Sequence, residues 1–239
     1  WYFTDNRQEL YFKQVFRVAK KAGLVPENTE LKFFGFGTMN GSDGKPFKTR
    51  AGGVMNLTDL MEMVKEITAS KLNMDLVKEE DKDETSEKIS IAALKYADFL
   101  PYRSKDFIFD VTKFADLDGK TGPYLLYSTV RMNSLLEKSG IEIDDKKIEK
   151  ILGVEKETVR ILLELPNILK NSIESKSLNE IADYLYRLTS SYNKFYAENH
   201  ILTCKDDNLK ETWLVLTKLV KDTNLLLLNI LAIEVPEKM

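Results

Sequence analysis

The sequence has very few of the residues that build cross-links and metal sites. Its 239 residues include one cysteine, Cys204, so no disulfide can form within the chain, and one histidine, His200, which argues against a Cys/His zinc site. We therefore expect no protein-bound metal, assign neither residue a function, and interpret the cysteine count as typical of a reducing, cytoplasmic setting. The longest apolar run, residues 225–228, is far shorter than a membrane span, so no membrane contact is expected.

An excess of positive charge is also missing. Lys and Arg number 35 against 38 Asp and Glu, which gives a net charge of −3 and excludes a global basic footprint for nucleic acid, although a local one stays possible. The length and the 43% of hydrophobic residues favour two modest domains. The chain starts with WYFTDNRQEL and has no initiator methionine, so we expect a fragment that begins inside a domain.

The first part of the chain has an α/β pattern. Short aromatic segments at residues 1–5 and 31–39 predict strands, and Phe12, Val15, Phe16 and Ala19 recur between them at helical spacing. A second amphipathic helix is predicted from residue 57, with Asn56 as its N-cap. Strand, helix, strand, loop and helix are too few to cover both faces of a sheet, which again favours truncation.

The remainder is predicted to be a helical bundle. Residues 78–88 are almost wholly charged and indicate a solvated linker or an exposed helix end, so we place domains at residues 1–75 and 76–239. Helices are expected at 89–99, at 124–138 after Pro123, from the capping box Ser177–Glu180, and from residue 209 to an end set by Pro236, whereas 106–119 is expected to be extended or irregular.

The glycine-rich loop GSDGKPFKTRAGG at residues 41–53 has the composition of a phosphate-binding loop. It does not match a Walker A loop, because Met39 stands at the first glycine and Pro46 at the hydroxyl position. It does not match the dinucleotide fingerprint either, because Asn40 stands at the third glycine. On these residues alone, a turn with solvated lysines is an equally good interpretation.

Residues 39–64, MNGSDGKPFKTRAGGVMNLTDLMEMV, closely resemble the ATP loop of bacterial-type arginyl-tRNA synthetases, in which the KMSK signature of class I enzymes has degenerated. The segments YFTDNRQELYFKQVF, ALKYADFLPYRSKDFIFD, DLDGKTGPYLLYSTVR, YNKFY and VPEKM resemble successive blocks of the same family. The resemblance covers essentially the whole chain. It implies a mainly α fold, in which the truncated end of a Rossmann-like α/β catalytic domain precedes an α-helical anticodon-binding domain.

The resemblance implies arginine–tRNA ligase activity in the parent protein, with ATP, its Mg²⁺ counter-ion, L-arginine and tRNA(Arg) as ligands. No covalent nucleophile is needed, whereas charge developing on the triphosphate must be stabilised, and Lys45 and Lys48 on a glycine-permitted loop suit this role. Gln8 is expected to accept hydrogen bonds from the substrate arginine; the alternative is a cap of the following helix. The expected ATP-binding residues are Phe36, Gly37, Gly44, Lys45, Lys48 and Arg50. For Phe36 and Gly37 the alternative role is simple packing within the strand.

The helical part is expected to bind tRNA through aromatic and basic residues. Tyr124, Tyr127 and Arg131 share one helix face, and Tyr192, Asn193 and Tyr196 share another, as stacking on unstacked bases would require. Tyrosines at this spacing are equally typical of a core. The resemblance adds Met239 to the expected tRNA contacts, and we assign Trp213 to the core.

The sequence departs from the family pattern in two places, which bear on tRNA binding and on catalysis. The D-A-L-R stretch of the anticodon-binding domain is present as residues 207–210, Asp-Asn-Leu-Lys, so two of its four positions differ. The HIGH motif is not in this sequence, and we therefore expect the isolated chain, a monomer, to be inactive. Two alternatives stay open, namely a stand-alone tRNA- or RNA-binding helical module without catalysis and an enzyme with another nucleotide-dependent reaction on a related loop.

Overall fold

The computed structural model describes residues 1–41, 43–45, 55–71, 77–141, 143 and 155–239. The chain divides into two compact units. The first unit comprises Trp1–Met55 and Pro101–Asp110, and the second comprises Asn56–Leu100 and Val111–Met239. The predicted domain boundary after residue 75 stays a prediction, although the helix that precedes it packs within the second unit.

The first unit contains two pairs of parallel strands. β1 (Tyr2–Asp5) pairs with β2 (Phe33–Phe36), and β3 (Met39–Asn40) pairs with β4 (Phe107–Ile108). The short β4 lies in a segment that was expected to be extended or irregular. The predicted strand over residues 31–39 is thus divided between two different sheets.

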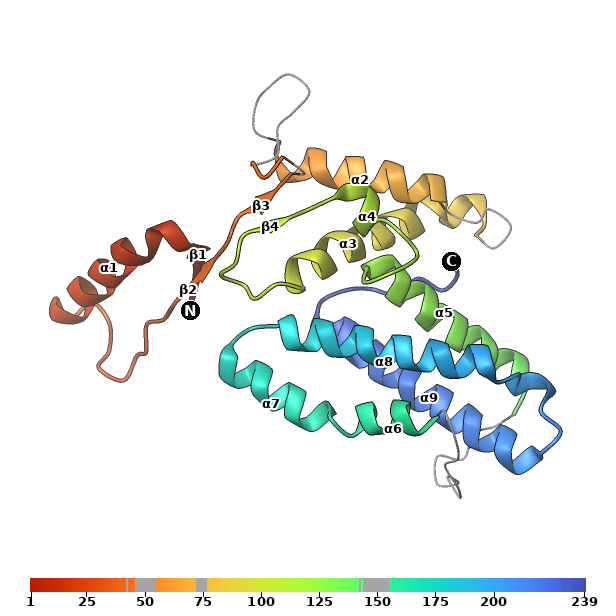
Figure 1. Ribbon diagram of the computed structural model, residues 1–239. Helices are drawn as coiled ribbons and strands as arrows, with labels where there is room; N and C mark the ends of the chain where they lie inside the picture. Colours follow the sequence, from red (N-terminus) through yellow and green to blue (C-terminus); the bar gives the residue numbers. More distant parts are fainter. Residues whose placement is uncertain (42, 46–54, 72–76, 142, 144–154) are drawn as a thin grey trace. The chain divides into compact units, whose positions relative to one another are not determined.

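The helix that connects β1 to β2 is held on the strands by aromatic side chains. The chain leaves β1 through the 3-10 helix η1 (Asn6–Gln8) and enters α1 (Glu9–Lys21), as Figure 1 shows. Within α1, the Phe16 ring centroid lies 5.0 Å from that of Tyr2 in β1, and the Phe12 centroid lies 5.6 Å from that of Phe33 in β2. The predicted helical spacing of these phenylalanines therefore marks the strand-facing side of α1.

The second unit is almost wholly helical. In Figure 1 α5, α8 and α9 lie side by side, and α6 and α7 lie along α8. Its elements are α2 (Leu57–Lys71), η2 (Glu79–Asp81), α3 (Lys82–Phe99), α4 (Val111–Phe114), α5 (Gly122–Ser139), α6 (Glu155–Leu162), α7 (Leu165–Ser175), α8 (Asn179–Glu198), η3 (Ile201–Thr203) and α9 (Asp207–Ile230).

Side-chain caps mark the start of three helices of this unit, α2, α5 and α9. The predicted cap of α2 is present, since Asn56 Oδ1 accepts a hydrogen bond from the Asp59 backbone N–H at 2.9 Å. Thr121 caps α5 in the same way, 3.2 Å from the Tyr124 backbone nitrogen, and Pro123 stands in the first turn as predicted. Asp206 caps α9. The charged segment at 78–88 forms η2 and the start of α3, which is the exposed helix end rather than the linker.

Two predicted helix signals are wrong. α8 begins at Asn179, and the Ser177 hydroxyl donates to the Asn179 side chain at 2.8 Å, so it does not cap the helix. Its intended partner, Glu180, accepts from Asn171 instead. α9 ends at Ile230, well before Pro236, because the chain turns at Ala232, whose φ is +53°. In the first case a bond between neighbouring side chains replaces the cap, and in the second a residue with positive φ ends the helix before the proline.

The core of the second unit combines apolar packing with buried polar bonds. Asn224 of α9 is fully buried and donates to Thr189 of α8 at 3.0 Å and to Thr129 of α5 at 3.3 Å. The hydroxyl of buried Tyr96 donates to the Ala182 carbonyl at 2.8 Å, and burial raises the pKa of this phenol. Such bonds specify which faces of the helices meet, because an unpaired buried polar group is costly. No helix in the described part of the chain is long and apolar enough to cross a membrane.

The contact between α3 and α5 depends on a glycine. A Cβ at Gly122 would lie 2.2 Å from the Ala92 carbonyl oxygen, and backbone cannot move aside as a flexible side chain can. We expect Gly122→Ala to lower the free energy of unfolding by about 1–3 kcal/mol, as overpacking does. Urea unfolding measures the change, with Ser134→Ala on the same helix as the control. Equal midpoints for the two variants would contradict this account of the α3–α5 contact.

Candidate functional site

The described start of the glycine-rich loop forms a tight turn. The Gly41 backbone N–H donates to the Lys45 carbonyl at 2.8 Å, and the Gly44 N–H donates to the Gly41 carbonyl at 2.9 Å. Gly44 has a φ of +72°, a value that favours glycine, and the Asp43 carboxylate accepts the Lys45 backbone N–H at 3.0 Å. Lys45 is thus exposed at the end of a defined turn. The predicted residues Lys48 and Arg50 lie outside the described residues.

The backbone packed against residue 37 in the first unit leaves room only for a glycine. The Gly37 N–H donates to the Arg103 carbonyl at 2.9 Å, and a Cβ at this position would lie 2.3 Å from the Lys105 carbonyl carbon and oxygen. The next residue, Thr38, donates its backbone N–H to Asp106 at 2.7 Å. Strand packing therefore accounts for the glycine by itself, while Phe36 remains 44% exposed at the end of β2.

Gln8 is exposed at the junction of η1 and α1. It occupies the N-cap position of α1, but its side chain makes no capping hydrogen bond, so the capping interpretation is wrong. The preceding 3-10 helix η1 is capped by Asp5, whose carboxylate accepts the Arg7 backbone N–H at 2.8 Å. The same carboxylate accepts two hydrogen bonds from the Arg7 guanidinium, at 2.6 and 2.8 Å. These hydrogen bonds lower the pKa of Asp5 to about 2. The Gln8 amide is left free to meet a ligand.

In the second unit the two predicted aromatic faces come together. Arg131 of α5 donates from Nη2 to Asn193 Oδ1 of α8 at 2.6 Å. Asn193 Nδ2 in turn donates to the Tyr124 hydroxyl at 2.7 Å and to Ser128 Oγ at 2.9 Å. One amide therefore binds three residues of α5. We call Tyr124, Tyr127, Arg131, Asn193 and Tyr196 the α5–α8 cluster.

Arg131 is the only cation of this cluster and lies between two rings. Its guanidinium carbon is 4.8 Å from the Tyr196 ring centroid and 5.6 Å from that of Tyr127. No carboxylate among the described residues pairs with it, and its Nε is buried without a hydrogen-bond partner there. A half-buried guanidinium that no carboxylate neutralises suits an acceptor supplied by a ligand at its exposed part.

Two of the predicted RNA contacts are buried instead. Tyr192 is 1% exposed, its hydroxyl shares a hydrogen bond with Thr217 at 3.0 Å, and burial raises its pKa. A ring with so little exposure has no face for a base, so we assign Tyr192 to the core. Met239 is 7% exposed within the same core, and Trp213 packs against that core as predicted.

Two residues beside the α5–α8 cluster were missed. The Tyr186 ring centroid lies 5.9 Å from that of Tyr124, and Lys120 Nζ lies 5.5 Å from the Tyr186 centroid. Tyr186 precedes Asn193 by seven residues, a helical repeat that could have revealed it. Lys120 could not have been found in this way, because it lies before α5 and pairs with Asp183 of α8 at 2.5 Å.

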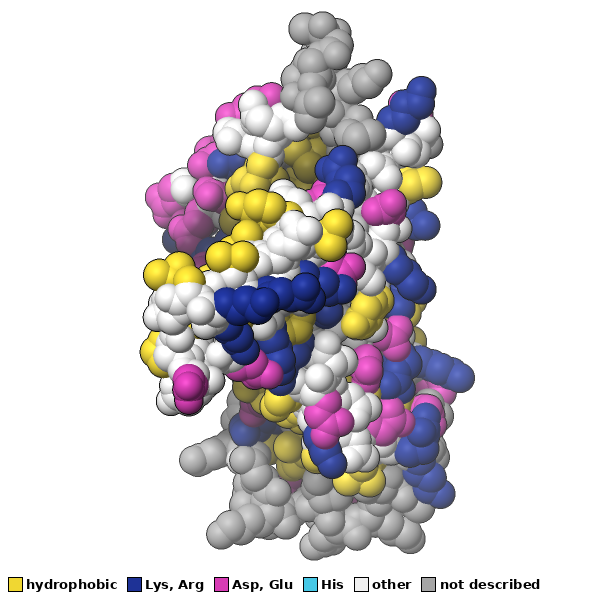
Figure 2. Space-filling model, turned by 90° about the vertical axis from the view of Figure 1, so that its left-hand side faces the viewer, with side chains coloured by type: hydrophobic (Ala, Val, Ile, Leu, Met, Phe, Trp, Pro, Cys, Tyr) yellow, Lys and Arg dark blue, Asp and Glu magenta, His cyan; other side chains and the backbone are white. Residues whose placement is uncertain are grey.

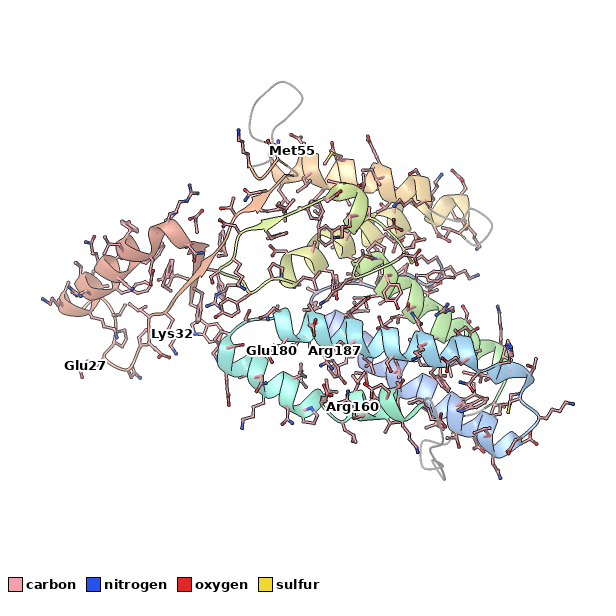
Figure 3. All side chains as sticks on the ribbon, in the orientation of Figure 1. Glu27, Lys32, Met55, Arg160, Glu180 and Arg187 are labelled. Carbon is pink, nitrogen blue, oxygen red and sulfur yellow. The ribbon has the colours of Figure 1, made fainter. Side chains whose placement is uncertain are left out.

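A ladder of ion pairs continues from Asp183 along the surface. Arg187 bonds Asp183 at 3.2 Å and Glu164 at 2.9 Å, and Arg160 bonds Glu164 at 2.8 Å. Figure 3 shows Arg160 on α6 and Arg187 on α8, on the two sides of this ladder. Exposed pairs of this kind contribute little stability one by one, but together they link the junction of α6 and α7 to α8.

Comparisons with known proteins identify both parts of the chain. Residues 1–111 match the profile of the class I tRNA synthetase (R) catalytic domain, and residues 125–239 match that of the DALR anticodon binding domain. Arginine–tRNA ligase of Alkaliphilus oremlandii is 42% identical over 242 residues, which cover all of this chain and 41% of the relative. Arginine–tRNA ligase of Francisella tularensis subsp. novicida is 37% identical over 246 residues, with 42% of the relative covered.

Solved structures share the fold. Arginyl-tRNA synthetase of Thermus thermophilus superposes with a TM-score of 0.84 at 20% identity, over 99% of this chain and 40% of that one. The enzyme of Plasmodium falciparum gives 0.80 at 24% identity, over 100% and 41%.

The central amide of the α5–α8 cluster can be tested in the free protein. We expect Asn193→Ala to lower the free energy of unfolding by about 1–3 kcal/mol, because it leaves Arg131 and the Tyr124 hydroxyl without their partner. Asn133→Ala, which removes an exposed bond to Glu137, serves as the control and should change it by less than about 0.5 kcal/mol. If urea unfolding gives equal values for both, Asn193 does not organise the cluster.

The chain spans about two-fifths of the length of the curated relatives that it matches. It aligns with the C-terminal part of these relatives, and its catalytic-domain match precedes its anticodon-binding match. The chain thus corresponds to the C-terminal part of the arginyl-tRNA synthetases, in which the end of a class I catalytic domain is followed by a DALR anticodon-binding domain.

Proposed function

We propose that the chain serves an arginine–tRNA ligase, in which its second unit binds tRNA(Arg) and its first unit supplies part of the ATP and arginine sites. The reaction joins arginine to tRNA at the expense of ATP. The arginine carboxylate attacks the α-phosphate of ATP, pyrophosphate leaves and arginyl-adenylate forms. A hydroxyl of the terminal adenosine of the tRNA then attacks the arginyl carbonyl, the acyl–phosphate bond breaks and AMP leaves. Every step depends on stabilising phosphate charge, so cations and backbone donors are the groups required.

The α5–α8 cluster is the observation that carries the proposal for tRNA. It presents Tyr124, Tyr127 and Tyr196 around a guanidinium that has no carboxylate partner in the described structure. Proteins bind unpaired bases by stacking them on aromatic rings and by hydrogen bonding to their edges. Because Asn193 fixes Arg131 and Tyr124 before any ligand arrives, binding should cost little side-chain ordering.

The first unit supports a role in the ATP and arginine sites. The turn at Gly41–Lys45 leaves the Lys45 side chain exposed beside a glycine of positive φ, and an exposed ammonium group suits contact with phosphates. In the proposal Lys45, Lys48 and Arg50 neutralise the triphosphate together with Mg²⁺, and Phe36 and Gly37 border the adenine. The exposed Gln8 amide accepts from the guanidinium of arginine.

The surface of the first unit indicates that it works as part of a larger α/β domain. Figure 2 shows hydrophobic side chains on the face that carries α1. Among the residues of this unit, Trp1 is 64% exposed, Phe3 52%, Leu10 68% and Tyr11 61%. Large apolar side chains exposed to this extent mark surfaces that pack against another part of the protein or a partner.

The isolated 239-residue chain should therefore neither exchange pyrophosphate with ATP nor form arginyl-tRNA. It holds at most part of the ATP site, and a partial set of charges cannot hold the substrates in reacting geometry. Radioactive pyrophosphate exchange and tRNA charging measure both steps, with a complete relative as the positive control. Sustained arginylation by the purified chain would contradict the proposed division of the site.

The same chain should bind tRNA(Arg) through the α5–α8 cluster. We expect Tyr124→Ala and Tyr196→Ala each to weaken binding by about 5- to 150-fold, since stacking on one base is worth about 1–3 kcal/mol. Lys45→Ala should weaken it less. Titration of labelled tRNA at fixed salt measures the three affinities, and Tyr11→Ala, which removes an exposed ring on α1, is the matched control.

Selectivity completes this test. The parent chain should prefer tRNA(Arg) to a tRNA with a different anticodon loop, and the two tyrosine variants should lose the preference. If both tyrosine variants bind like the parent while Lys45→Ala does not, the RNA has been placed on the wrong unit.

A further inference from the structure

The charge of the chain is divided unequally between its two units. The first unit carries eleven Lys and Arg against seven Asp and Glu, a formal charge of +4. The remainder carries 24 against 31, a formal charge of −7. The net acidity of the whole chain therefore hides a basic unit, and an approaching polyanion would be attracted to the first unit and repelled by the second.

Helix α1 presents three different faces. Its phenylalanines face the strands, as the ring contacts with Tyr2 and Phe33 show. A second face carries exposed Tyr11, Val15 and Val18, which is an apolar stripe. A third face carries four exposed cations, Lys13, Arg17, Lys20 and Lys21, together with Glu9 and Leu10; we call these four cations the cationic face of α1.

Most of this face is not neutralised. Lys13 pairs with Glu9 at 2.7 Å, whereas Arg17, Lys20 and Lys21 have no carboxylate within ion-pair distance among the described residues. Other cations of the same unit are paired, for example Arg7 with Asp5 and Lys32 with Glu30. Figure 2 shows several dark-blue Lys and Arg side chains on the face of the molecule that it presents.

The helix dipole explains only part of this face. Cations in the last turn of a helix are favoured by its negative end, which accounts for Lys20 and Lys21. Arg17 and Lys13 lie one and two turns earlier, beyond the range of that effect. Cations at positions 13, 17 and 20 or 21 recur at every turn and form a line, which fits a partner whose negative charges also repeat along a line.

We infer that the cationic face of α1 binds the phosphate backbone of tRNA, independently of base sequence. The inference rests on the proposed function, since it takes the same RNA as partner, but it assigns a different task to a different unit. The α5–α8 cluster supplies selectivity through bases, and the cationic face supplies attraction through phosphates. Because phosphates are common to every tRNA, this contact should not distinguish one tRNA from another.

The salt dependence of binding tests the inference directly. The triple variant Arg17→Gln, Lys20→Gln, Lys21→Gln removes three cations, and each phosphate that is then no longer neutralised should lower the steepness of log K against log salt by about 0.7–0.9. We expect the slope to fall by about 2–3 and the affinity at low salt to fall by the same factor for tRNA(Arg) and for a tRNA with another anticodon loop. All three side chains are exposed, so folding is not at risk.

A matched control separates the effect of the cations on α1 from the effect of the total charge of the chain. Lys156→Gln, Lys170→Gln, Lys205→Gln removes the same charge from exposed positions of the second unit and should leave the slope close to that of the parent. If the α1 triple variant keeps the parent slope, or changes it no more than this control, the inference is overturned. A lower melting temperature with an unchanged slope overturns it as well, because the cations then serve the helix alone.

The two proposals fail separately. If Tyr124→Ala loses selectivity while the α1 triple variant keeps the parent salt slope, the proposed function stands and only RNA binding by the cationic face is rejected. If the α1 triple variant has a lower salt slope while the tyrosine variants bind like the parent, RNA binding by the cationic face stands and RNA binding by the α5–α8 cluster is rejected.

Discussion

The packing of α5 against α3, α8 and α9 is the constraint on which the second unit depends. Gly122 lets α3 approach the start of α5 at backbone distance, and the hydroxyl of Thr129 meets Asn224 from α9. These contacts settle which residues of α5 point inward. The remaining stripe, with Tyr124 and Arg131, is thereby directed at Asn193 of α8, so the geometry of the α5–α8 cluster follows from the core beneath it.

Charged side chains are balanced differently in the two units. Within the second unit, the surface ladder from Lys120 to Arg160 balances charge pair by pair, and Arg131 stands out because no described carboxylate balances it. In the first unit the imbalance belongs to a whole helix face. A chain with a net charge of −3 can still attract RNA in this way, because local potentials rather than the total charge govern approach.

Much of this fold could be predicted from local patterns, and the errors have physical causes. Hydrophobic periodicity and the cap at Asn56 located helices correctly, since both act within one or two turns. The Ser177 capping box failed because the hydroxyl bonds Asn179 instead. Periodicity also placed Tyr192 and Tyr196 on one face, but only packing decides that Tyr192 is buried and Tyr196 is half exposed. The bridge from Arg131 to Asn193 joins residues 62 positions apart, a relation that spacing along one helix cannot reveal.

The central claim is that the α5–α8 cluster holds unpaired bases of the tRNA anticodon loop. Chemical footprinting of tRNA(Arg) on the parent chain and on Tyr124→Ala tests it most directly. The account predicts that the parent protects nucleotides of the anticodon loop and that Tyr124→Ala removes this protection while backbone protection elsewhere persists. Protection confined to other parts of the tRNA, or an anticodon-loop footprint unchanged in Tyr124→Ala, would contradict it.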